Sequence, residues 1–123
     1  MSSILVVEDE MSLRSVFERM LTRAGHEVTI AADGAKALRI LEASSFDVVI
    51  TDLIMPEMEG LSLLRALRKT TSPPKVIAMS GGGRGSATDY LEMAKMLGAA
   101  ATLAKPFTQQ ELSDAIERVL AAP

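Results

Sequence analysis

Short apolar runs recur along the chain at the intervals expected of strands that alternate with helices. In order, they are Ile4–Val7, Glu27–Ala31, Val48–Thr51, Val76–Met79 and Ala100–Ala104. In three of them the apolar residues are consecutive, over residues 4–7, 48–50 and 76–79, which is typical of strands buried on both faces of a parallel sheet. The last run has small residues and low strand propensity, and we assign it as a strand mainly because the alternation requires one there.

The segment that begins near Met11 has the clearest helical pattern. Its apolar residues recur at the i, i+3, i+4, i+7 spacing of one helix face; they are Leu13, Val16, Phe17, Met20, Leu21 and Ala24. Gly25 follows, as is common where a helix ends. His26, the only histidine, falls in the following turn and is expected at the surface, not as a ligand.

Four further helices are expected from the same periodicity. They start near Asp33, cover about residues 60–69, cover about residues 86–97, and start at Thr108. Thr108 and Glu111 have the spacing of a capping box, and the last helix has an apolar stripe of Leu112, Ala115, Ile116 and Val119. Five strand–helix units predict one α/β domain over residues 1–123, a doubly wound, flavodoxin-like parallel sheet of five strands with five helices. The strand order 2-1-3-4-5 is expected because flavodoxin-like folds have it. The spacing of the elements in the sequence does not by itself determine this order.

Composition supports a single globular domain and excludes several classes of protein. Of the 123 residues, 48% are hydrophobic and 24% are charged, and the net charge of −3 lacks the basic excess of nucleic-acid-binding domains. The chain has no cysteine, so it has no disulfide and no thiolate metal site. Its apolar runs are shorter than the roughly 18 residues of a membrane span, and its first residues do not resemble a signal peptide. We expect a cytoplasmic protein without direct nucleic-acid or membrane partners.

Ionic and hydroxyl side chains directly follow four of the five predicted strands. Glu8 and Asp9 follow the first, Asp52 the third, Ser80 the fourth and Lys105 the fifth. The carboxyl ends of parallel strands meet at one edge of a sheet, so these residues are expected to converge there. Acids at strand ends also commonly just face water, but four matched ends with complementary chemistry favour a functional site.

The expected cluster needs more positive charge than one lysine provides. Three carboxylates close together repel one another, and one ammonium group leaves an excess of negative charge. A divalent cation with oxygen ligands removes this excess, and Mg²⁺ suits a site with few carboxylates plus water. An adjacent lysine and hydroxyl would then suit a phosphoryl group bound to that metal.

With these motifs the chain resembles the receiver domains of two-component response regulators. The resemblance runs through LVVEDE, DLIMPEMEG, MSGGG and KPF in that order. It implies that Asp52 is a phosphoacceptor, with Lys105 and Ser80 in contact with the phosphoryl oxygens. The Mg²⁺ ligands that it implies are Asp9, Asp52 and the backbone carbonyl of Ile54, together with Glu8, which would act either directly or through water. It also implies a cis peptide bond between Lys105 and Pro106.

The resemblance further implies partners and a switch. The phosphoryl donor would be a sensor histidine kinase or a phosphotransfer protein, and phosphorylation would control the binding of a downstream protein. Ser80 and Thr102 are the expected switch residues. Thr102 stands where the family usually has Tyr or Phe, so we expect the signal to leave through residues 81–90 instead of the family's serine–aromatic coupling.

Two other functions use similar residues. A phosphatase of the haloacid-dehalogenase type also has a strand-end Asp nucleophile and Mg²⁺, but it needs a second acid where this chain has Ile54. A receiver-like scaffold that is never phosphorylated would not need the complete set of acids, hydroxyl and lysine. We expect a phosphorylated switch and not a metabolic enzyme, either as a protein by itself or as the N-terminal part of a longer one.

Overall fold

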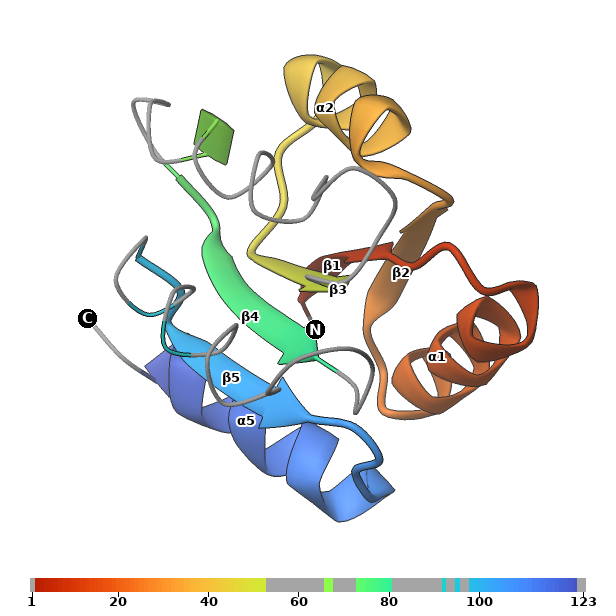
Figure 1. Cartoon of the computed structure of the whole chain (residues 1–123), viewed down its shortest axis with the longest axis vertical. Helices are drawn as coiled ribbons and strands as arrows, with labels where there is room; N and C mark the ends of the chain where they lie inside the picture. Colours follow the sequence, from red (N-terminus) through yellow and green to blue (C-terminus); the bar gives the residue numbers. More distant parts are fainter. Residues whose placement is uncertain are drawn as a thin grey trace.

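Five parallel strands form one sheet in the computed structural model, which describes residues 2–52, 66–67, 73–80, 92, 95 and 98–121. The strands are β1 (Ser3–Val7), β2 (Glu27–Ala31), β3 (Val48–Asp52), β4 (Lys75–Ser80) and β5 (Ala101–Ala104). Their order is β2-β1-β3-β4-β5, and each neighbouring pair is parallel. The expected doubly wound sheet is confirmed (Figure 1).

Three helices lie against the sheet in the described part of the chain. They are α1 (Met11–Arg23), α2 (Gly34–Ala43) and α5 (Gln109–Ala121). Figure 1 shows α1 and α5 on one side of the sheet and α2 on the other. Residues 66–67, 92 and 95 are also helical and fall within the third and fourth expected helices. The rest of those two helices lies outside the described residues.

Successive residues of the central strands pack into two separate apolar layers. Leu5 and Val7 of β1 lie in the layer that includes residues of α2, whereas Ile4 and Val6 lie in the layer that includes residues of α1 and α5. All four side chains are fully buried. Burial on both faces explains why this strand is a continuous apolar run in the sequence.

Side chains cap the starts of α2 and α5. The Asp33 carboxylate accepts the Lys36 N–H at 2.8 Å. Thr108 Oγ1 accepts the Glu111 N–H at 3.1 Å, and Glu111 Oε1 accepts the Thr108 N–H at 2.9 Å, so the predicted capping box is confirmed. The predicted apolar stripe of α5 is also confirmed, because Leu112, Ala115, Ile116 and Val119 are all buried.

Helix α1 ends in a Schellman motif centred on Gly25. The Gly25 N–H donates to the Thr22 carbonyl at 3.0 Å, and the His26 N–H donates to the Leu21 carbonyl at 3.1 Å. Gly25 has a φ of 92°, in the left-handed region that is unfavourable for residues with a Cβ. A Cβ added there would meet no atom within 4 Å, so its cost would be confined to the backbone.

Replacement of Gly25 by alanine is expected to lower the free energy of unfolding by about 1 kcal/mol, because alanine must adopt the left-handed conformation. Urea denaturation of the two proteins measures the difference. Gly25→Asn is the matched variant, and its loss should be smaller because asparagine tolerates this region better. An alanine variant as stable as the wild type would show that the turn changes its conformation.

Two residues of the predicted apolar face of α1 are exposed. Val16 exposes 48% of its surface, and Ala24, at the C-cap of the helix, is also exposed. Periodicity marks the apolar face of a helix but not how much of that face is covered by the rest of the protein. Phe17 and Leu21 fill the contact with the sheet and α5, which leaves Val16 at its edge.

The prediction that His26 lies at the surface was also wrong. The residue is half-buried and lines a small cavity together with residues of α1 and α5, among them Leu21 and Ile116. Its Nδ1 atom is buried and has no hydrogen-bond partner among the described residues. The cause is the tight turn after α1, which holds His26 under the end of that helix and beside α5.

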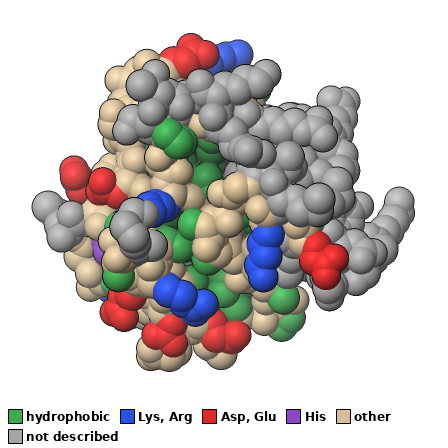
Figure 2. Space-filling view, turned by 90° about the vertical axis from the view of Figure 1, so that its left-hand side faces the viewer, with side chains coloured by type: hydrophobic (Ala, Val, Ile, Leu, Met, Phe, Trp, Pro, Cys, Tyr) green, Lys and Arg blue, Asp and Glu red, His purple; other side chains and the backbone are tan. Residues whose placement is uncertain are grey.

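One face of the described part carries mixed charge. Figure 2 shows the face on the left-hand side of Figure 1, where Lys and Arg side chains are interspersed with Asp and Glu side chains. On this face, the described residues do not form a continuous basic surface. Among the residues that the structure describes, no helix is both long and apolar enough to cross a membrane.

Candidate functional site

The site lies at the carboxyl ends of β1, β3 and β5. Glu8 directly follows β1, Asp52 is the last residue of β3, and Lys105 directly follows β5. The parallel register pairs Val7 with Thr51, so the next residue on each strand, Glu8 and Asp52, reaches the same edge of the sheet. The convergence expected of these three residues is therefore found in the structure.

The ammonium group of Lys105 bridges two buried carboxylates. Its Nζ lies 2.9 Å from Glu8 Oε1 and 2.8 Å from Asp52 Oδ2. Glu8 is 1% exposed and Asp52 is 5% exposed, while the Lys105 side chain is 19% exposed. The lysine thus neutralises part of a charge cluster that is almost removed from water.

Asp9 completes a group of three acids at this edge. Glu8, Asp9 and Asp52 each offer a carboxylate oxygen, and these oxygens lie within 4.8 Å of one another. Asp9 is exposed, so the cluster opens to solvent on its side. One ammonium group beside three carboxylates leaves negative charge in excess, and oxygen ligands in this number suit Mg²⁺. The residues present fit that cation.

Burial and charge act in opposite directions on the two paired groups. Burial raises the pKa of Glu8 above its ordinary value, although the hydrogen bond and charge of Lys105 partly oppose the rise. Burial alone would lower the pKa of Lys105, but the hydrogen bonds and charges of Asp52 and Glu8 outweigh it and leave the pKa raised. Lys105 therefore stays protonated and positively charged. Burial disfavours the charged form of Glu8, and an added cation would stabilise that form.

The remaining predicted site residues are placed only in part. The backbone of Ser80 ends β4 and pairs in register with Ala104, but its side chain is outside the described residues. Thr102 is half-buried on β5 and pairs with Ala78. The carbonyl of Ile54 and the expected signalling loop at residues 81–90 also lie outside the described residues. The predicted cis peptide bond between Lys105 and Pro106 is present.

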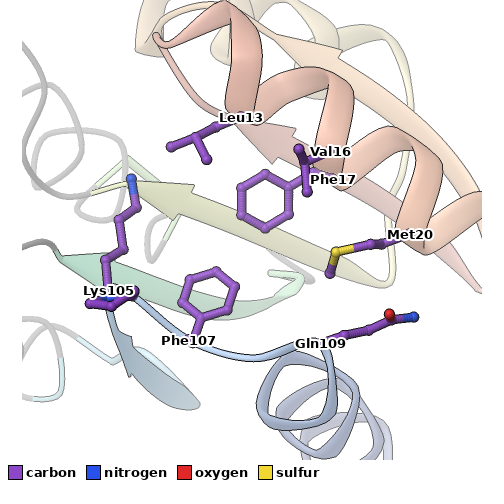
Figure 3. Close-up of a pocket in the computed structure, with 8 residues that line it drawn as sticks. Leu13, Val16, Phe17, Met20, Lys105, Phe107 and Gln109 are labelled. Atoms are coloured by element: carbon purple, nitrogen blue, oxygen red, sulfur yellow. The ribbon is translucent and has the colours of Figure 1, made fainter.

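An apolar groove of about 390 Å³ runs beside Lys105, between α1 and the start of α5. Figure 3 shows Lys105 at one end of it, with its ammonium group directed toward the end of β3. The other lining residues include Leu13, Val16, Phe17, Met20, Phe107 and Gln109. The rings of Phe17 and Phe107 have centroids 5.9 Å apart. Sequence reasoning missed this groove because periodicity shows that a helix has an apolar face but not which part of that face stays uncovered.

Comparisons with known proteins agree with this geometry. The family described as "Response regulator receiver domain" matches residues 4–117. The probable transcriptional regulator ycf27 of Cyanophora paradoxa is 36% identical over 117 residues, which are 95% of this chain and 47% of that protein. The chain therefore spans about half the length of this curated relative.

Solved structures show the same similarity. A response regulator receiver domain protein from Clostridium thermocellum has a TM-score of 0.88 and 36% identity over 98% of this chain and 94% of that chain. The chemotaxis response regulator CheY4 of Vibrio cholerae has a TM-score of 0.86 and 32% identity over 98% of this chain and 99% of that chain. Both similarities cover the strands that carry the acidic cluster.

Proposed function

Because this chain belongs to the response regulator receiver domains of two-component signalling, we propose that its Asp52 accepts a phosphoryl group and so switches partner binding. Receiver domains are signalling switches and not typical enzymes. The observation that carries the proposal is the position of Asp52, a buried carboxylate at the end of β3 that is paired with Lys105 and lies beside two further acids.

The proposed reaction is an exchange of one bond to phosphorus for another. A carboxylate oxygen of Asp52 attacks the phosphorus atom of a phosphohistidine, the P–N bond breaks, and the imidazole leaves with the electron pair and takes up a proton. The product is an acyl phosphate on Asp52. Lys105, whose Nζ lies 2.8 Å from Asp52 Oδ2, would stabilise the negative charge of the phosphoryl oxygens.

The proposed cofactor is Mg²⁺, which when bound supplies positive charge to the acids and the phosphoryl oxygens. Asp9 and Asp52 would be direct ligands, together with the backbone carbonyl of Ile54 that the family resemblance implies. Both oxygens of Glu8 already have partners, because Oε1 contacts Lys105 and Oε2 accepts the Glu10 N–H at 3.2 Å. We therefore assign Glu8 to the metal through water.

The proposal includes two partners and a switch. A sensor histidine kinase or phosphotransfer protein would donate the phosphoryl group in the cytoplasm, and the phosphorylated state would bind a downstream protein. Ser80 would contact a phosphoryl oxygen, and Ser80 and Thr102 would be the switch residues. The half-buried position of Thr102 on β5 is compatible with that role. Direct contact with nucleic acid is not part of the proposal.

The apolar groove beside Lys105 is the surface on which we place the phosphohistidine-bearing protein. The groove adjoins the residue that contacts Asp52, so a protein seated there would bring its phosphohistidine to the reacting carboxylate. Val16 lines the groove and is half-exposed, so it is available to a partner. A small phosphodonor would reach Asp52 without touching this surface.

Val16→Glu is therefore expected to slow phosphoryl transfer from the phosphohistidine partner by about tenfold, because a buried unpaired charge at an interface costs at least 1.4 kcal/mol. Labelling by acetyl phosphate should be unchanged. The rate of transfer from the phosphorylated partner, measured with labelled phosphate, tests this. Ser15→Glu adds the same charge at an exposed position of α1 outside the groove and serves as the control. Equal rates for the two variants would place the partner elsewhere.

Incubation with acetyl phosphate and Mg²⁺ tests the central proposal. The intact mass should rise by one phosphoryl group, and borohydride reduction followed by peptide mapping should locate that group at Asp52. Label at another residue would contradict the proposal. The two alternatives predict other results: an unphosphorylated scaffold takes up no label, and a phosphatase turns over small phosphomonoesters continuously.

A further inference from the structure

Arg14 reaches back from the first turn of α1 to the residues that carry the acidic pair. Its Nη1 donates to the carbonyl oxygens of Glu8 and Asp9, each at 3.1 Å. The backbone N–H of Arg14 donates to the Glu10 carbonyl at 3.0 Å, so the residue itself is fixed by the start of the helix. The side chain is half-buried. One guanidinium group therefore connects a rigid helix to both acidic residues.

Other hydrogen bonds hold the two ends of the acidic turn, defined here as residues 8–10. The Glu8 N–H donates to the Ala31 carbonyl at 3.0 Å, and the Glu10 N–H donates to Glu8 Oε2 at 3.2 Å. Ser12 Oγ donates to Glu10 Oε1 at 3.0 Å. None of these three bonds involves Asp9. The Arg14 guanidinium holds the middle of the turn.

The acidic turn needs such a restraint because its charges repel one another. The carboxylate oxygens of Glu8, Asp9 and Asp52 lie within 4.8 Å of one another. Asp9 is exposed, so its side chain can move away from the other two acids into solvent. Movement of Asp9 away from the cluster would lower the repulsion and would also remove a metal ligand. A charged donor makes stronger hydrogen bonds than a neutral one, so Arg14 can oppose this movement.

We propose that Arg14 is a positioning residue, which sets the direction of the Glu8 and Asp9 carboxylates toward Asp52 by holding both of their carbonyl groups. This inference rests on the proposed function and assigns Arg14 a part in preparing the Mg²⁺ site. Arg14 does so without contact with the cation or the reacting atoms. Groups that orient metal ligands change the affinity for the metal although they do not touch it.

The sign of the effect separates positioning from simple electrostatics. A guanidinium group near the acids repels a cation, so the loss of its charge alone would strengthen Mg²⁺ binding. The loss of its two hydrogen bonds would weaken Mg²⁺ binding, because the acids would no longer be held together. We expect the second effect to dominate in Arg14→Gln, whose shorter side chain does not reach the two carbonyls.

The dissociation constant for Mg²⁺ is therefore expected to rise about tenfold in Arg14→Gln, the lower end of the range for groups that orient metal ligands. Titration of the protein with MgCl₂, followed by calorimetry, measures it. Arg19→Gln removes the same charge from an exposed position of α1 and should bind Mg²⁺ as the wild type does. A dissociation constant in Arg14→Gln that is unchanged or lower overturns the inference.

Amide hydrogen exchange in EDTA gives a second readout, which does not depend on the metal. The Glu10 N–H, bonded to the Glu8 carboxylate, should exchange faster in Arg14→Gln, while the N–H groups of Phe17 and Leu21 in α1 exchange as before. Uniformly faster exchange along α1 would show that Arg14 only supports the helix, and would overturn the inference.

Arg14→Lys keeps the charge but shortens the reach, so it should also weaken Mg²⁺ binding. Wild-type affinity in this variant would show that the paired hydrogen bonds from the guanidinium group to the two carbonyls are not needed, and would overturn the positioning role. Failure of the inference and failure of the proposed function remain distinguishable. If the wild type neither binds Mg²⁺ nor takes up phosphoryl label, the proposed function fails. If it does both and the Arg14 variants match it, only this inference fails.

Discussion

Asp52→Asn is expected to reduce phosphoryl incorporation from acetyl phosphate to background. An amide lacks the anionic oxygen that attacks phosphorus, and removal of a nucleophile that forms the covalent intermediate removes the reaction itself. The change keeps the size of the side chain, and Lys105 retains its contact with Glu8, so the fold should persist. Intact mass after incubation with acetyl phosphate and Mg²⁺ measures the incorporation, and circular dichroism verifies the fold.

Asp114→Asn is the matched control for this result. Asp114 is an exposed acid on α5 whose carboxylate accepts a hydrogen bond from Gln110 at 2.8 Å, outside the acidic cluster. This variant should incorporate phosphate as the wild type does. Phosphoryl label that persists in Asp52→Asn, under conditions in which Asp114→Asn is also labelled, would mean that another side chain is the phosphoacceptor.

Lys105→Met should lower the free energy of unfolding in EDTA by about 3 kcal/mol, the cost of leaving a buried charge without its partner. The two carboxylates that contact the Lys105 ammonium, on Glu8 and Asp52, are 1% and 5% exposed. Methionine replaces most of the side-chain volume but none of the charge. Urea denaturation at constant pH, with EDTA present, measures the loss.

Mg²⁺ should restore a larger share of stability in Lys105→Met than it adds to the wild type, because a bound cation replaces the missing positive charge. Lys36→Met removes an exposed lysine from α2 and should change the stability little in either buffer. If Lys105→Met unfolds in EDTA at the same urea concentration as the wild type, then the ammonium group does not neutralise the buried acids.

The acidic cluster could be predicted because each of its residues lies at the end of a strand or within two residues after it. Parallel strands end at one edge of a sheet, so the positions of Glu8, Asp52 and Lys105 in the sequence determine where they meet. The structure adds two facts that the sequence does not contain. Lys105 bridges Glu8 and Asp52, and Asp9 is the exposed member of the three acids. Pairing of this kind depends on side-chain conformation at distances of a few ångströms.

The weak fifth strand shows how topology can outweigh local propensity. The run Ala101–Ala104 contains small residues and would not be assigned as a strand by propensity alone. Its place after four strand–helix units predicted it, and in the structure it pairs with β4 along its whole length. Lys105 follows this strand, so the prediction of the site depended on that assignment.

The groove, the burial of His26 and the contacts of Arg14 could not be predicted in the same way. Periodicity shows that Val16 belongs to an apolar face, but coverage of that face depends on how closely α5 approaches α1. Arg14 has the pattern of a solvated helix charge, since a partner made of backbone carbonyls has no signature in the sequence. His26 is held inward by the geometry of one turn.

The burial of both faces of β1 and β3 has a consequence for how these strands are aligned. In a strand with one solvent-exposed face, the alternation of apolar and polar residues sets the register, because a slip of one residue would expose the apolar side chains to water. In β1 and β3, a slip of one residue would move apolar side chains from one buried layer into the other, so it would expose little apolar surface to water. It would, however, carry Glu8 or Asp52 about 3.3 Å along the strand and onto the opposite face. The contacts of Lys105 with Glu8 and Asp52, together with the packing of individual side chains, therefore determine the register of the central strands.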